Sequence, residues 1–136
     1  MIKVNKQGEV WVFAEQREGK LEDIPLELMS RARELADKLG VKLGSFVLGD
    51  KVEHLCKKLI QFGADKVYVV ENPLLEHYQT SSYSKVICEL IHKYEPQIVL
   101  FGASACGRDL APHIASAIKA GLTADCTDLE LSLIHI

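Results

Sequence analysis

Apolar residues along this chain follow two alternating patterns, short continuous runs and stripes with a spacing of three and four residues. Strands built around such runs are expected at 9–14, 41–48, 64–70 and 98–101. The stripes have the period of helices and lie at about 25–39, 52–62, 80–94 and 109–120. Strands that alternate with helices favour a parallel sheet covered on both faces and joined by right-handed crossovers. The pattern therefore predicts a three-layer α/β/α domain with a mostly parallel sheet.

Capping residues and prolines set the expected ends of the later helices. Thr80 or Ser81 is the expected N-cap of the third helix, and Pro96 prevents that helix from continuing. Because proline is tolerated in the first turn of a helix, Pro112 predicts that the last helix begins near Asp109.

Two segments are less regular. Near the start, the polar residues 15–20 predict a turn, after which residues 21–24 pair back briefly. At the end of the chain, residues 121–127 are expected to form a loop, and residues 128–136 are expected to form a short strand at a sheet edge.

Length and composition limit the class of protein. The 136 residues provide for one domain with one core. An apolar content of 48%, a charged content of 26% and a net charge of -3 are typical of a globular protein and lack the basic excess of nucleic-acid-binding proteins. No apolar window has the length of a membrane span, and the first residues do not form a signal peptide, so we expect a cytoplasmic protein without a membrane span.

The four cysteines have no C-x-x-C spacing, which argues against a zinc site, a dithiol redox centre and a disulfide framework. Cys56 and Cys88 lie within apolar helical stripes and are expected to be buried thiols. Cys106 is expected to be the same, although a position near a helix N-terminus and Arg108 would favour a lowered pKa. No base lies nearby in the sequence to support a catalytic thiol.

The turn after the fourth strand is the candidate site, because parallel sheets bind ligands where the carboxyl ends of strands meet helix N-termini. Gly102 and Gly107 have the spacing of the phosphate loop G-x-x-x-x-G-K-[ST]. Arg108 replaces the lysine of that motif, and Asp109 stands where a hydroxyl would hold magnesium. The turn therefore does not predict a nucleoside triphosphatase.

The charged residues of this turn have more than one interpretation. Arg108 is either a bidentate contact for a carboxylate or phosphate, or a solvated charge. Asp109 is best explained as an N-cap or first-turn residue that accepts backbone N–H bonds. Ser104, Thr123, Asp125 and Thr127 would line the same end of the sheet if the segment after the last helix folds back.

Residues 100–127, LFGASACGRDLAPHIASAIKAGLTADCT, resemble the alpha subunit of electron transfer flavoproteins. The similarity is specific in Gly102–Ala103, in 107–112 and in 121–127, and similar residues at 10–15 and 36–40 extend it to residues 1–131. The resemblance implies the amino-terminal domain of that subunit, with a fold of the adenine-nucleotide-hydrolase-like class. Residues 132–136 do not resemble the family's continuation, and we interpret them as an atypical tail, either a truncation scar or a foreign read-through.

The resemblance also implies a function. The domain would pair with a beta subunit of similar fold and act as a scaffold and dimerisation domain, not as an enzyme. The complex would pass electrons from dehydrogenases, such as the acyl-CoA dehydrogenases of fatty acid beta-oxidation, to an acceptor. Its FAD would lie chiefly in a carboxyl-terminal domain that this chain does not include, with AMP or a second FAD in the partner subunit.

For this chain, the resemblance leaves a set of residues for cofactor binding or partner contact. These are Gly102, Ser104, Gly107, Arg108, Thr123 and Asp125. Position 113 is His where the family commonly has Arg, so an ion pair there does not carry over, and His113 is expected to be exposed. The alternative is a stand-alone adenine-nucleotide-binding module similar to universal stress proteins, although the sequence lacks a Gly- and Ser-rich phosphate loop, which disfavours ATP and leaves AMP open.

Overall fold

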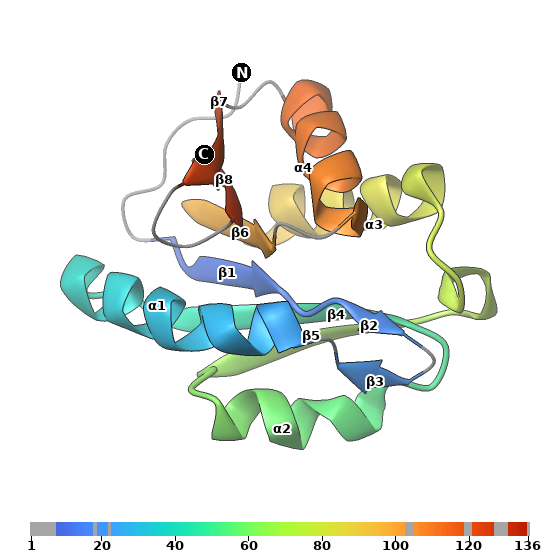
Figure 1. Ribbon diagram of the computed structural model, residues 1–136, viewed down its shortest axis with the longest axis horizontal. Helices are drawn as coiled ribbons and strands as arrows, with labels where there is room; N and C mark the ends of the chain where they lie inside the picture. The colour runs from blue at the N-terminus through green and yellow to red at the C-terminus, as the bar shows by residue number, and fades with distance from the viewer. Residues whose placement is uncertain are drawn as a thin grey trace.

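The computed structural model describes residues 8–17, 19–21, 23–102, 105–118, 121–126 and 131–135 of the chain. Its core is a six-stranded sheet in the order β5-β4-β1-β6-β8-β7 (Figure 1). The strands are β1 (Val10–Phe13), β4 (Leu43–Gly49), β5 (Lys66–Glu71), β6 (Ile98–Gly102), β7 (Gly121–Cys126) and β8 (Leu131–His135). The first four are parallel to one another, whereas β8 runs antiparallel to both β6 and β7. The expected mostly parallel α/β fold is confirmed.

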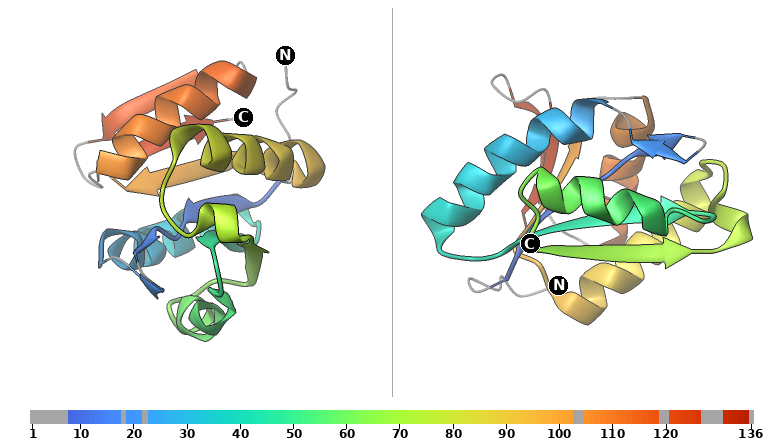
Figure 2. Two further views of the ribbon diagram at one scale, coloured as in Figure 1. Left: turned by 90° about the vertical axis from the view of Figure 1, so that its right-hand side faces the viewer. Right: turned by 90° about the horizontal axis from the view of Figure 1, so that it is seen from below.

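Four helices cover the two faces of this sheet, as both views of Figure 2 show. They are α1 (Asp23–Leu39), α2 (Cys56–Gln61), α3 (Thr80–Tyr94) and α4 (Ala105–Ile118). Helices α3 and α4 pack on Trp11, Phe13 and Phe101, while α1 packs on the alternate residues Val10 and Val12 of β1. Helix α2 packs on the same face as α1, mainly beside β4 and β5. Side chains alternate along a strand, so one strand supplies apolar groups to both layers.

Short elements complete the described chain. A hairpin of β2 (Gln16–Arg17) and β3 (Lys20–Leu21) follows β1. Most of this pairing lies within the segment 15–20 expected as a turn, and residues 23–24, expected to pair back, belong to α1. Single turns η1 (Glu53–Leu55) and η2 (Pro73–Leu75) precede α2 and α3. Gly40, with φ +68°, ends α1 in the left-handed conformation that glycine adopts without steric cost.

Two expectations about the helices in the second half of the chain are wrong. The N-cap of α3 is Gln79, one residue before the expected Thr80. Helix α4 begins at Ala105, and Pro112 lies inside it, where it cannot donate a hydrogen bond to the carbonyl of Arg108. Buried contacts of Leu110, Ala111, Ile114 and Ala115 with the rest of the core stabilise the helix in spite of that loss.

The end of the chain also differs from the expectation. Residues 121–126, expected as a loop, form the edge strand β7. Residues 131–135, expected at an edge, form β8 in the interior of the sheet between β6 and β7. Pairing of β7 with β8, and of β8 with both β6 and β7, decides these assignments, and single-sequence strand propensity does not contain that information. The origin proposed for residues 132–136 stays a prediction.

Candidate functional site

The candidate site lies at the topological switch point of the sheet. From β1 the chain moves outward to β4 and β5, and then returns to β6 on the other side of β1. The carboxyl ends of β1 and β6 are therefore neighbours from which the chain diverges, which is where open α/β sheets bind ligands. Glu15 follows β1 at this point, and Gly102 ends β6.

Three of the residues predicted from the sequence come together here. Gly102 is buried at the end of β6, and Gly107 and Arg108 lie in the first turn of α4. Gly107 is buried, whereas Arg108 is exposed. Ser104 and Thr127 lie outside the described residues. The turn therefore places the Arg108 guanidinium at the protein surface next to the switch point.

Thr123 and Asp125 lie on β7 and not in a loop that folds back over the site. Cys126 of β7 pairs with Leu131, which pairs with Gly102, so the end of β7 reaches the same sheet edge as β6. One strand, β8, separates β7 from β6, which corresponds to about 10 Å between their backbones. Asp125 is next to this edge, whereas Thr123 is further inside the strand.

Asp109 has a different role from the predicted N-cap. It lies in the second turn of α4, and its Oδ2 accepts hydrogen bonds from the hydroxyls of Tyr78 and Thr80, the latter at 2.5 Å. These two bonds, with the one from Thr80 the stronger influence, hold the pKa of Asp109 below its usual value. The contact joins the start of α3 to α4. Sequence reasoning missed it because Tyr78 and Asp109 are 31 residues apart and share no motif.

For Cys106, the structure contradicts the interpretation that the pKa of the thiol is lowered. Burial, followed by the nearby carboxylates of Glu15 and Asp109, raises the pKa of Cys106 to about 12. A hydrogen-bonding contact with Glu15 contributes in the same direction. Cys106 is therefore protonated at neutral pH, and the reactive thiolate that a helix N-terminus would favour is excluded. Cys56 and Cys88 are half-buried, less than expected.

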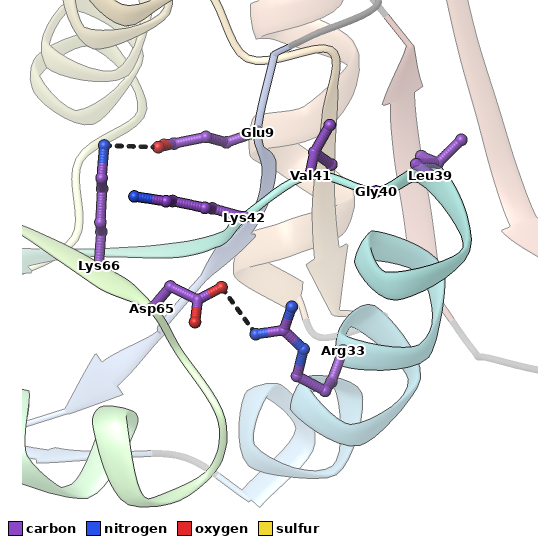
Figure 3. A pocket seen from close by; sticks show the side chains of 8 residues that line it. All are labelled: Glu9, Arg33, Leu39, Gly40, Val41, Lys42, Asp65 and Lys66. Carbon is purple, nitrogen blue, oxygen red and sulfur yellow. Dashed lines mark hydrogen bonds and ion pairs between the residues drawn. The ribbon is translucent and has the colours of Figure 1, made fainter.

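A hollow lies at the opposite, amino-terminal edge of the sheet (Figure 3). It has a volume of about 720 Å³ and is lined mainly by charged side chains and by the end of α1. Within it, Lys66 pairs with Glu9 at 2.9 Å and Arg33 pairs with Asp65 at 2.7 Å. These ion pairs largely neutralise the lining, so the hollow is a weaker candidate for a charged ligand than its number of charges suggests.

Two further features of the described residues bear on the class of site. They contain no group of three or more His, Cys, Asp or Glu side chains arranged for a metal ion. No helix within them is both long enough and apolar enough to cross a membrane. His113 is exposed on α4, as expected.

Comparison with known proteins decides the family. The electron transfer flavoprotein domain matches residues 10–134, which extend from the first residue of β1 into β8. The chain belongs to the electron transfer flavoprotein family. The match to this family includes residues 132–134 of the segment that the sequence suggested was atypical.

Curated members of the electron transfer flavoprotein family are similar over nearly the whole chain. The alpha subunit of the electron transfer flavoprotein from Thermoanaerobacterium thermosaccharolyticum is 53% identical over 94% of this chain and 39% of its own length. The alpha subunit from Clostridium acetobutylicum is 47% identical over 98% of this chain and 39% of its own length. The acryloyl-CoA reductase electron transfer subunit beta from Anaerotignum propionicum is 45% identical over 96% of this chain and 35% of its own length.

The chain thus spans about two fifths of the length of the curated relatives it matches. Their names support an electron transfer role of the alpha-subunit type. They do not favour the alternative of a stand-alone nucleotide-binding module.

Electron transfer flavoproteins imply a flavin, and the described residues of the switch point do not fit its phosphates. The carboxylates of Glu15 and Asp109 flank Cys106 there and would repel a phosphate. Between β1 and β4, the Gln16 side chain donates to the carbonyl of Leu48 at 3.0 Å and occupies the space beside Gly49, where a Cβ would lie 2.6 Å from Gln16 Nε2. The carboxyl ends of β1 and β4 are therefore filled by the protein's own groups.

Proposed function

We propose that this chain is the amino-terminal region of an electron transfer flavoprotein alpha-type subunit. With a beta subunit and FAD, the complete protein would pass electrons from dehydrogenases to an acceptor. The observation that carries this proposal is the 53% identity to a named alpha subunit over 128 residues. Such identity over nearly every element of the sheet supports the same role in the larger assembly.

Within that assembly, the chain would act as a scaffold and dimerisation domain and not as a catalyst. FAD, when bound, supplies the ring system that accepts and releases electrons. The misfit of the switch point to phosphates supports an FAD site chiefly outside this chain, with AMP or a second FAD in the partner subunit. We therefore assign no step of electron transfer through FAD to the residues of this turn.

We further propose acyl-CoA dehydrogenases, as in fatty acid beta-oxidation, as electron donors. The name of the Anaerotignum propionicum relative, an acryloyl-CoA reductase electron transfer subunit, supports a partner that acts on acyl-CoA thioesters. A cytoplasmic location stays a prediction.

The turn after β6 would provide a partner contact, with Arg108 as its main charged group. Its guanidinium is exposed in the first turn of α4, and the buried Gly107 allows close packing at the base of the turn. A guanidinium in such a position binds a carboxylate in a bidentate manner. Gly102, Ser104, Thr123 and Asp125 are proposed as further members of the same edge.

Charge reversal of Arg108 tests this role in the full-length subunit co-expressed with its partner. We expect Arg108→Glu to weaken association about tenfold, equivalent to about 1.4 kcal/mol. Arg31→Glu is the matched control, because Arg31 is also exposed but lies on α1, on the other face of the sheet. Association is measured by titration of the two subunits, and flavin content by absorption of the purified complex. Unchanged association and flavin content in Arg108→Glu would contradict the proposed contact.

A further inference from the structure

Three aromatic side chains form a cluster of tilted ring contacts at the amino-terminal side of the sheet. Trp11 of β1 and Tyr68 of β5 have ring centroids 4.8 Å apart, and Tyr68 and Tyr94 of α3 have centroids 4.7 Å apart. Trp11 and Tyr94 are 6.3 Å apart. Trp11 and Tyr68 meet across the intervening strand because Gly44 has no side chain there, and a Cβ on Gly44 would lie within 3.2 Å of both rings.

The aromatic cluster extends from the core to the surface. Trp11 is fully buried, Tyr68 is half-buried, and Tyr94 has 43% of its surface exposed. Tryptophan and tyrosine are the two aromatic side chains that one-electron oxidants oxidise most readily. Each of the three rings contacts another of them, so a ring that has lost an electron can be reduced by its neighbour.

The carboxylate of Glu9 is hydrogen-bonded to two members of this aromatic cluster, Tyr68 and Trp11. Glu9 Oε1 accepts the hydroxyl of Tyr68 at 2.6 Å and the indole N–H of Trp11 at 2.9 Å, while Glu9 Oε2 pairs with Lys66 at 2.9 Å. Burial opposes ionisation of Glu9, but these three donors outweigh it and lower the pKa of Glu9. The carboxylate is thus ionised at neutral pH and within proton-transfer distance of the phenol.

This geometry matters because an oxidised phenol is far more acidic than the phenol itself. A tyrosine that loses an electron must also lose its hydroxyl proton to become a stable neutral radical. A carboxylate at 2.6 Å receives that proton without any movement of heavy atoms. Tyr68 therefore has the proton acceptor and the aromatic neighbours that one-electron oxidation requires.

We propose that Tyr68, with Glu9 as its proton acceptor, is a site of one-electron oxidation that exchanges electrons with Trp11 and Tyr94. A one-electron oxidant at the surface, of the class of ruthenium(III) polypyridyl complexes or oxygen-derived radicals, is reduced by one electron. Tyr68 loses that electron, and its hydroxyl proton passes to Glu9 Oε1. The products are a neutral phenoxyl radical and a protonated Glu9, and re-reduction by one electron returns the proton to Tyr68.

The chain contains an internal comparison for this site. Tyr78 also donates to a carboxylate, that of Asp109, but its ring contact is an edge contact with Tyr83 at 5.1 Å. Trp11 is the single tryptophan of the 136 residues, so an indole radical in this chain has one source. The inference does not depend on the proposed function, because it concerns a separate edge of the sheet and a separate oxidant.

Flash-quench oxidation of the purified protein with ruthenium(III) tris-bipyridine tests the proposal, with transient absorption to follow phenoxyl and indole radicals. Tyr68→Phe is expected to remove most of the phenoxyl signal, and Tyr78→Phe is expected to retain it. Glu9→Gln keeps an oxygen that accepts the hydrogen bond but does not take the proton, so radical formation at Tyr68 should slow about a hundredfold. Glu89→Gln, an exposed change on α3 that removes the same charge, is the matched control.

Circular dichroism of each variant establishes that it is folded. A second measurement needs no variant: because the proton moves with the electron, phenoxyl formation should be slower in heavy water than in ordinary water. An unchanged rate in Glu9→Gln, the absence of a solvent isotope effect, or loss of the signal in Tyr78→Phe and not in Tyr68→Phe would overturn the proposal.

Discussion

Gly44 allows a direct test of how closely the backbone of β4 packs against the aromatic cluster of Trp11, Tyr68 and Tyr94. In Gly44→Ala, the new Cβ would lie 2.8 Å from Trp11 Cδ1, 2.9 Å from Trp11 Nε1 and 3.2 Å from Tyr68 Cε2. Trp11 is fully buried and bonded to Glu9, so it cannot move aside without losing that hydrogen bond. Overpacking of this kind costs about 1–3 kcal/mol, and the lower entropy of the unfolded alanine chain offsets about 0.4–1 kcal/mol. We expect a net loss of about 1–2 kcal/mol in the free energy of unfolding.

Urea unfolding followed by far-ultraviolet circular dichroism measures this loss. The same substitution in a Trp11→Phe background should cost less, because the smaller ring leaves room for the Cβ, with a coupling energy of about 1 kcal/mol. Gly40→Ala is the control. Nothing lies within 4 Å of the added Cβ at that position, but φ is +68°, so its cost comes from backbone strain and should be equal in both backgrounds. If Gly44→Ala is neutral, or costs the same with Phe as with Trp at position 11, the steric argument is refuted.

Two further predictions concern the carboxyl edge. The hydroxyls of Thr80 and Tyr78 depress the pKa of Asp109 in the folded protein below 3.8, so its stabilising effect is fully present above 3.8 and is lost as the pH falls through the lower folded value. Asp109→Asn should therefore lower stability at neutral pH and reduce the loss of stability in acid, as measured by urea midpoints across that range; an unchanged acid dependence would contradict this. Burial and neighbouring carboxylates raise the pKa of Cys106 to about 12, so iodoacetamide should modify this thiol slowly in the folded protein at neutral pH and rapidly after unfolding. Peptide mass spectrometry measures both rates, and equal rates in the two states would show that the thiol is not protected.

The parts of the fold that the sequence predicts best are those in which local pattern and tertiary environment agree. The run at 10–13 is apolar without interruption, and β1 is buried along its whole length, with helices on both faces. Trp11 and Phe13 are core residues, as expected. The apolar stripe at 25–39 likewise matches α1, which buries Leu28, Met29, Ala32 and Ala36. In these elements, burial and periodicity carry the same information.

The misses have a common physical cause, which is pairing over a long distance in the sequence. The residues of β7 are small and polar enough to suggest a loop, and their strand conformation depends on β8. Aspartate is a common N-cap residue, which is why the sequence suggests that role for Asp109. In the structure, Asp109 instead accepts hydrogen bonds from the hydroxyls of Tyr78 and Thr80, which are 31 and 29 residues earlier in the chain. Pro112 also misleads about where α4 begins. The preference of proline for the first turn predicts a start near Asp109, but core packing of the neighbouring residues stabilises a helix that begins at Ala105.

Under the proposed function, charge reversal at Arg33 and at Arg108 is expected to change different properties of the protein. Arg33 is bonded to Asp37, to Asp65 and to the carbonyl of Gly63, so it joins α1 to the segment before β5. Arg108 lies exposed in the first turn of α4, next to the switch point. Reversal of a charge that maintains the fold lowers the free energy of unfolding, whereas reversal of a charge that contacts a partner changes association. The subunit titration of Arg108→Glu therefore has to be read beside its urea midpoint, because weaker association at unchanged stability is the result that assigns Arg108 to an interface.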